Sequence, residues 1–257
     1  MSLDLSEYID GWDCPRDHIA ARLITGRDGS TYAQMRVDLG VLQMALNGRP
    51  DGERYHGLPT ALDFVQHEMR VSHDLDASHW RELHRELQQF NYRRLALSRL
   101  ADEALERRDN DLAKSLIAGA ISDIEGCLSA INLLERQSRE RPPEFNLAPT
   151  FVFNRARLRS RLAALDERID EAIEEAEAGA RSLEQMLHNL GVDGESVEED
   201  AGVMFLRKTA SDLRAKHQIQ RTLQEQLSEA IDNDDFEAAA RLRDEMRRRG
   251  YTPPSEE

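Results

Sequence analysis

Five arginines near the end of the chain are the residues whose type and spacing most readily do chemistry: Arg241, Arg243, Arg247, Arg248 and Arg249. Guanidinium groups pair with phosphate oxygens, so such a run is typical of a nucleic-acid contact. Positive charge in the last turn of a helix is also what the helix dipole favours. Arg247, Arg248 and Arg249 are therefore the candidate nucleic-acid contact, and the charge of the whole chain bears on that interpretation.

Histidines and cysteines offer no second site. The four histidines at 67, 73, 79 and 84 have spacings of six, six and five, which place no two of them on one helical face. Cys14 precedes a proline in an irregular segment, and Cys127 lies beside an apolar stripe, where a small buried thiol is expected. The sequence contains no phosphate-binding loop, dinucleotide-binding turn, serine-hydrolase elbow, zinc-protease motif or kinase motif. We expect no catalytic residue, no cofactor and no metal, and hence no enzyme.

The charge of the chain disfavours a broad nucleic-acid footprint. Its 257 residues include 34 basic and 49 acidic side chains, a formal net charge of −15. A protein that binds nucleic acid or anionic lipid neutralises phosphates with a basic face. The first residues carry acids where a secretory signal has basic and apolar residues, and the two cysteines lie far apart. We expect a cytoplasmic protein with reduced thiols and no membrane contact.

A mainly α fold must position these groups. Leu, Ala, Glu and Arg dominate the composition, and aromatic residues make up only 5%. Residues 1–58 are the exception, because an irregular leader is followed by short apolar runs over 23–24, 32–37 and 39–46 and by the breaker cluster 47–52. This pattern predicts a small antiparallel β-meander.

Residues 59–141 predict a helical hairpin domain. Apolar residues recur at spacings of three and four from Pro59, a longer helix begins at 76–78, and the run 109–111 interrupts the period before it resumes. The turn at 109 loosely resembles the later turn at 235, but we interpret the two as unrelated hairpins. Prolines at 142, 143 and 149 mark a linker over 142–150.

Residues 151–218 predict a long antiparallel coiled-coil arm. Its first helix has a heptad seam with alternating spacings of four and three: Leu158, Leu162, Leu165, Ile169, Ala172, Ala176, Gly179, Leu183, Met186 and Leu190. The small residues at the centre of the seam allow a partner helix to approach closely. We expect one uninterrupted helix here, and a helix of forty residues is about 60 Å long. The seam can close within one chain or between two.

Residues 219–250 predict a helical hairpin at the end of the arm. Leu223 and Leu227 give the first helix its apolar face, the run 232–235 forms the turn, and Phe236 begins the second helix. Asp234 and Glu237 have the spacing of a capping box, with Asp as the N-cap. Gly250 ends this helix, and residues 251–257 are expected to be a disordered tail.

This hairpin resembles the UVR motif of the UvrB and UvrC subunits of bacterial nucleotide excision repair. The residues that carry the resemblance are Leu223, Leu227, Phe236, Glu237, Ala239, Ala240, Leu242, Arg243 and Asp244. Leu227 stands where the family usually has methionine. The resemblance covers only about residues 219–249, and it implies a bacterial protein whose hairpin pairs with a second copy of the motif. Related copies occur in protease adaptors and chaperones as well as in repair proteins.

Three functions remain open at this stage. The preferred one is a non-enzymatic adaptor or scaffold that recruits a protein with a UVR-like motif, or a second copy of itself, in excision repair or protein quality control. The second is a nucleic-acid-binding accessory of DNA repair. The third is a structural dimer joined through the coiled-coil seam. The position of the Phe236 side chain distinguishes these functions in part, because this side chain either anchors a partner or packs inward against Leu227.

Overall fold

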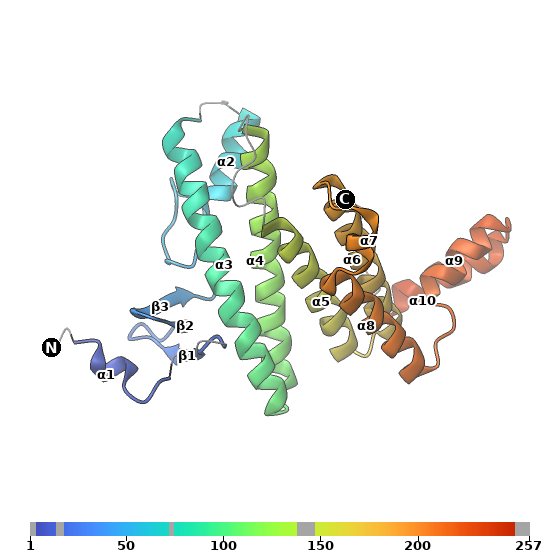
Figure 1. Cartoon of the computed structure of the whole chain (residues 1–257), viewed down its shortest axis with the longest axis horizontal. Coiled ribbons are helices and arrows are strands. Elements are labelled where there is room, and N and C mark those ends of the chain that lie inside the picture. Colours follow the sequence, from blue (N-terminus) through green and yellow to red (C-terminus); the bar gives the residue numbers. More distant parts are fainter. Residues whose placement is uncertain (1–3, 14–17, 72–74, 138–146, 250–257) are drawn as a thin grey trace. The chain divides into compact units, whose positions relative to one another are not determined.

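The computed structural model describes residues 4–13, 18–71, 75–137 and 147–249. The chain divides into two compact units, residues 1–145 and 146–257. Both are mainly helical, and the described part contains one small sheet, in the first unit (Figure 1). The predicted mainly α fold with an N-terminal meander and a C-terminal helix pair is therefore confirmed. Cys14, most of the predicted 142–150 linker and the predicted 251–257 tail lie outside the described residues.

The sheet of the first unit is a three-stranded antiparallel meander that follows the short helix α1 (Ser6–Ile9). Its strands are β1 (Ala21–Thr25), β2 (Thr31–Val37) and β3 (Gly40–Ala45), in the order β1-β2-β3. Met35 of β2 pairs with Ala21 on one side and with Leu42 on the other. Strands β1 and β2 pack on helix α3, and buried Ala33, Met35 and Met44 contribute to the core.

Three helices follow the sheet: α2 (Ala61–Val71), α3 (Ala77–Glu106) and α4 (Asn110–Gln137). The predicted start at 76–78 is confirmed, because the Asp76 side chain accepts hydrogen bonds from the N–H groups of Ser78 and His79. Helices α3 and α4 form an antiparallel hairpin (Figure 1). Among the described residues, α4 alone is long and apolar enough to cross a membrane by length and composition. Its buried residues instead make it a core helix of this unit.

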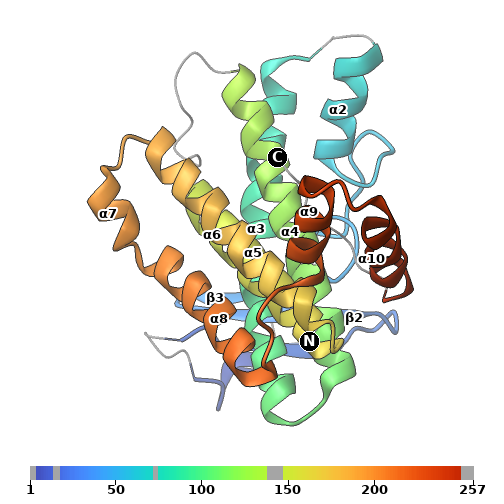
Figure 2. The same ribbon diagram turned by 90° about the vertical axis from the view of Figure 1, so that its right-hand side faces the viewer.

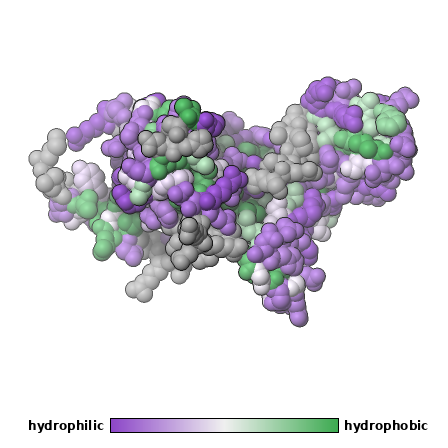
Figure 3. All heavy atoms as spheres, turned by 90° about the horizontal axis from the view of Figure 1, so that it is seen from above, coloured by the Kyte–Doolittle hydropathy of each residue, from purple (hydrophilic) through white to green (hydrophobic). Residues whose placement is uncertain are grey.

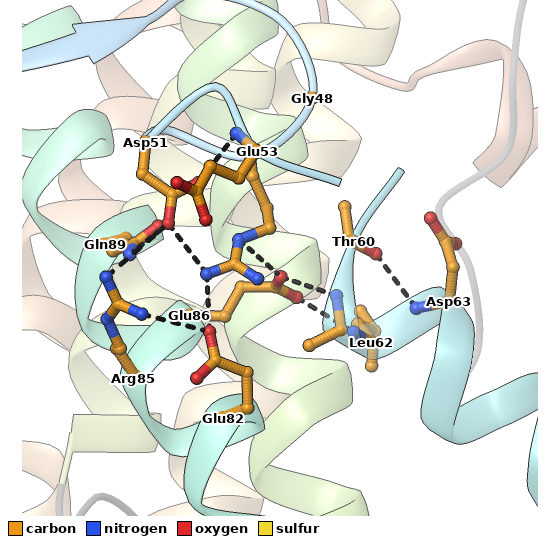
Figure 4. A network of polar contacts seen from close by, with 12 residues as sticks. Gly48, Asp51, Glu53, Thr60, Leu62, Asp63, Glu82, Arg85, Glu86 and Gln89 are labelled. Carbon is orange, nitrogen blue, oxygen red and sulfur yellow. Dashed lines mark hydrogen bonds and ion pairs between the residues drawn. The ribbon is translucent and has the colours of Figure 1, made fainter. Parts of the chain in front are cut away.

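Buried ion pairs attach the loop after β3 to the helices (Figure 4). Arg49 is 3% exposed, and its Nη2 lies 2.7 Å from Oδ2 of Asp51 and 2.6 Å from Oε1 of Glu82. Glu86 is fully buried and accepts hydrogen bonds from the first N–H groups of α2, at Ala61 and Leu62. Burial raises the pKa of Glu86 more than these N–H groups and Arg49 lower it. One buried carboxylate of α3 thus caps α2.

A second buried pair joins α3 to α4. Nη2 and Nε of Arg93 lie 2.6 and 2.9 Å from the two carboxylate oxygens of Asp123, and both side chains are almost fully buried. Nη1 of Arg93 also donates to the carbonyl oxygens of Ala45 and Gly48. A single guanidinium therefore connects both long helices to the end of the meander.

The second unit begins with a layer of helices along α6 (Figure 2). These helices are α5 (Ala148–Leu165), α6 (Ile169–Asn189), the short α7 (Gly194–Glu198) and α8 (Ala201–His217). Helix α6 packs on α5 and on α8. Two further helices, α9 (Leu223–Asp232) and α10 (Phe236–Arg248), complete the chain as a hairpin.

The predicted uninterrupted helix over residues 158–190 is wrong. The chain reverses between Leu165 and Ile169, where Glu167 has the left-handed φ of 61°, so the seam is divided between α5 and α6. The two halves pack on each other within one chain. Gly179 lies against Ala156 of α5, which confirms that the small residues at the seam centre allow close approach. The apolar spacing gave no sign of the break, because spacings of three and four also continue through this turn.

Three helical hairpins reverse with the same backbone turn. Arg108, Glu167 and Asp234 each have a left-handed φ, of 61°, 61° and 56°. The residue after each donates its N–H to the carbonyl of an alanine five positions earlier, at Ala104, Ala163 and Ala230. In each hairpin a second buried alanine lies nine positions after the first alanine, at Ala113, Ala172 and Ala239. The turns at 109 and 235, interpreted from sequence as unrelated, therefore share one local structure.

Candidate hairpin interface

The C-terminal hairpin is positioned by a cap at the start of each helix. The hydroxyl of Thr222 accepts a hydrogen bond from the N–H of Glu225, and the Glu225 carboxylate accepts one from the N–H of Thr222 at 2.6 Å. This reciprocal capping box fixes the start of α9. Helix α10 begins after Asp235, whose side chain accepts from the N–H of Ala238.

The predicted N-cap at Asp234 is wrong by one residue. Asp234 has a left-handed φ of 56°, which belongs to the end of the preceding turn, whereas an N-cap residue has a φ in the extended range. Asp235 takes the capping role instead. Both are aspartates, so residue type alone could not separate them.

The hairpin has a small core of its own. Leu223, Leu227 and Ala230 of α9 are buried against Ala239 and Met246 of α10, with Ala238 and Leu242 packed around them. Of the residues that carry the family resemblance, the structure thus places Leu223, Leu227 and Ala239 inside the hairpin and leaves Leu242 half-buried. These residues hold the two helices together rather than presenting a side chain to solvent.

The remaining predicted interaction residues are exposed, and most share one stripe of α10. We define the outer face of α10 as Phe236, Ala240, Arg243, Asp244 and Arg247, which recur at helical spacing and are all exposed. Phe236 is 71% exposed, so it does not pack inward against Leu227. Glu237 is exposed beside this face. Figure 3 shows hydrophobic side chains among hydrophilic ones on its right-hand lobe, where Figure 1 places the hairpin.

The three arginines predicted to contact nucleic acid each lie near an acid. Arg247 lies 3.7 Å from Asp244, and Arg248 lies 2.9 Å from Glu245. Arg249 pairs with Glu245 at 2.7 Å and with Asp170 at 3.4 Å. These pairs are surface interactions, and they offset much of the local positive charge that a phosphate would meet.

The hairpin is also attached to α6. The Thr222 hydroxyl donates to the carboxylate of Glu174, and both side chains are buried. Arg214, at the end of α8, lies 2.9 Å from a carboxylate oxygen of Glu177 and 2.8 Å from one of Glu225. The sequence reasoning missed Thr222, Glu174 and Arg214. Only the first had a readable signal, the Thr-x-x-Glu capping pattern at 222–225.

A groove of about 890 Å³ runs beside this attachment. Its apolar lining comes from Ile219, Leu223, Ala230, Ala238 and Leu242. The ion pair of Asp170 and Arg249 also lines it. The hairpin therefore has two different sides, a groove side next to α6 and the outer face of α10.

The similarity found between this chain and known proteins lies in the hairpin. No three His, Cys, Asp or Glu side chains among the described residues are grouped so as to hold a metal ion. No curated protein and no solved structure matches the chain. Residues 218–248 match the family model of the UvrB/uvrC motif, so the resemblance seen in the sequence is confirmed for this segment of the chain.

Proposed function

We propose that the chain is a non-enzymatic adaptor that recruits a protein partner through the outer face of α10, the partner being a UVR-like hairpin on another protein or on a second copy of this chain. The observation that carries the proposal is the exposure of Phe236. This residue is 71% exposed and is the first residue of α10, within the segment that matches the family model. A large aromatic side chain exposed beside a small residue, Ala240, is typical of an interface anchor.

Charge along α10 favours an antiparallel approach of such a partner. The turn and first residues of this helix are acidic, at Asp234, Asp235 and Glu237, whereas the five arginines lie between its middle and the residue after its end. Two hairpins with this polarity that cross antiparallel bring acid against base at both ends. A crossing centred on Ala240 places Glu237 of one helix opposite Arg243 of the other, because both lie three residues from the centre.

We place the adaptor in a bacterial cytoplasm, in excision repair or protein quality control. The motif match to UvrB/UvrC-type proteins supports excision repair as the first pathway to test. The free, buried thiol of Cys127 suits a reducing compartment.

The accessory nucleic-acid function is the weaker candidate. It needs Arg247, Arg248 and Arg249 to meet phosphate, yet each already lies near an acid, and the whole chain carries −15. It predicts binding to duplex DNA that falls steeply with salt and is lost when residues 241–249 are removed. Fluorescence anisotropy with a labelled duplex at two salt concentrations distinguishes it from the adaptor.

The experiment for the adaptor compares wild type with Phe236→Arg. Capture from bacterial lysate, read by mass spectrometry, should yield a protein with a UVR motif for wild type only, and sedimentation velocity on the purified chain tests a second copy as the partner. Leu39→Arg is the matched control, because Leu39 is 96% exposed in the β2–β3 turn and the charge change is the same.

We expect Phe236→Arg to weaken pairing by about 2 kcal/mol or more, roughly thirtyfold. The control should pair as wild type does. If wild type captures no UVR-motif protein and stays monomeric at high concentration, or if Phe236→Arg pairs normally, the adaptor proposal is wrong.

A further inference from the structure

One face of α6 carries three acids, of which two contact the hairpin directly and one contacts it through the end of α8. Asp170, Glu174 and Glu177 recur at spacings of four and three, so they share a face, which we name the α6 seat. Asp170 pairs with Arg249 after the end of α10, Glu174 accepts from Thr222 at the start of α9, and Glu177 pairs with Arg214. Arg214 continues to Glu225 of α9.

Apolar contacts reinforce these polar ones. Ile219, in the segment between α8 and α9, packs against a buried cluster formed by Ile173 and Ala176 of α6 and Ala210 of α8. Leu223 and Ile169 line the same cavity of about 210 Å³ at the beginning of α6. Thr222 is fully buried and Glu174 is 6% exposed, so water is excluded where the hairpin begins. The hairpin is thus held by packed as well as charged groups.

The contacts with α6 among the described residues come from one end and one side of the hairpin. Thr222 and Arg249 contact α6 directly, and Glu225 is linked to it through Arg214 of α8, whereas the outer face of α10 contributes none of the described contacts to α6. The α6 seat therefore distinguishes the two sides of the hairpin.

We propose that the α6 seat is an intramolecular dock that fixes the hairpin against the helices of the second unit and leaves the outer face of α10 as the side open to a partner. The direction in which a partner is held is then set by α6. The orientation of a partner rests on the proposed function. The docking of the hairpin on α6 does not, so it can be tested on the chain alone.

The experiment measures a distance between α8 and α9 in the full-length chain. Nitroxide labels at Ser211→Cys and Ser228→Cys, both exposed positions, are read by pulsed dipolar spectroscopy in a Cys14→Ser, Cys127→Ala background. Glu174→Ala with Glu177→Ala removes two of the three acids of the seat, those that bind Thr222 and Arg214, but keeps the capping box of α9. Glu184→Ala is the control, because it removes a different α6 pair, with Arg207 of α8 at 2.7 Å.

A narrow distance distribution is expected for the otherwise wild-type labelled chain and for Glu184→Ala, and loss of that narrow peak is expected for the double variant, with its helix content checked by circular dichroism. A broad distribution in the chain with an intact seat would overturn the proposal, whatever the variants do. So would a narrow peak that survives in the folded double variant. Phe236→Arg should leave the distance unchanged, so a failure of pairing and a failure of the dock are distinguishable.

Discussion

Gly179 of α6 lies so close to Ala156 of α5 that a Cβ atom added to the glycine would overlap the Cβ of the alanine. We predict that Gly179→Ala lowers the free energy of unfolding of the second unit by about 1–3 kcal/mol, because neither backbone can move without disturbing its neighbours. Urea unfolding followed by circular dichroism measures it. Gly194→Ala is the control, since a Cβ there meets no atom within 4 Å. Equal stability of both variants would contradict the prediction.

The buried pair of Arg93 and Asp123 should contribute to the free energy of unfolding of the first unit. Asp123→Ala leaves a buried guanidinium without its carboxylate, so we expect a loss of about 3–5 kcal/mol. Fluorescence of Trp12 and Trp80, the two tryptophans of the chain, follows unfolding of this unit in urea. Glu103→Ala removes a carboxylate from a half-exposed pair with Arg99 at 3.0 Å and should cost at most about 1 kcal/mol. A similar small effect for both would refute the prediction.

Charge reversal tests the antiparallel crossing on a self-associating chain. Glu237→Arg and Arg243→Glu should each raise the dimer dissociation constant about tenfold. In two helices that cross at Ala240, either change places like charges opposite each other at positions 237 and 243. The double variant should recover most of that loss, since the opposite charges again face each other. Sedimentation equilibrium gives the three constants. If the two losses simply add in the double variant, the helices do not cross in this register.

The dock of the hairpin on α6 should depend on pH in two opposite ways. Although burial raises the pKa of the Glu225 carboxyl, the hydrogen bonds from Arg214 and from the Thr222 N–H lower it below its ordinary value of 4.5. Its contribution is therefore fully present above 4.5 and is lost as the pH falls through the lowered pKa.

Glu174 has the opposite sign. Burial, together with the neighbouring Glu177 and Glu225 charges, raises its pKa despite the Thr222 hydrogen bond, so docking tightens as Glu174 gains a proton. The narrow distance peak should persist from neutral pH down to about 4.5 and broaden below it. With Glu225→Gln, broadening at low pH should be reduced. Broadening that begins between neutral pH and 4.5 would contradict this assignment.

Much of this structure follows from local sequence signals. The meander was readable from short apolar runs between breakers, the start of α3 from Asp76, and the C-terminal hairpin from its apolar spacing and its motif. These features depend on residues close together in the chain, where periodicity and capping act.

The features that sequence did not predict depend on distant residues or on a backbone state without a residue signature. The reversal at Glu167 uses a left-handed residue that is not glycine, so no breaker marked it. The bond from Thr222 to Glu174 joins residues 48 positions apart, and each had a plausible role as an ordinary surface or cap residue. The exposure of Phe236 was one of two alternatives, which only packing could decide.

The turn shared by the three hairpins has a consequence for how this chain can be tuned. A left-handed residue with a side chain costs roughly 1 kcal/mol relative to glycine, and the chain carries this cost at Arg108, Glu167 and Asp234. At each of these positions a single substitution to glycine is therefore expected to stabilise the turn. Asp234 lies near Phe236 but outside the outer face of α10, so a substitution there changes the stability of the hairpin without changing the face that we propose a partner binds.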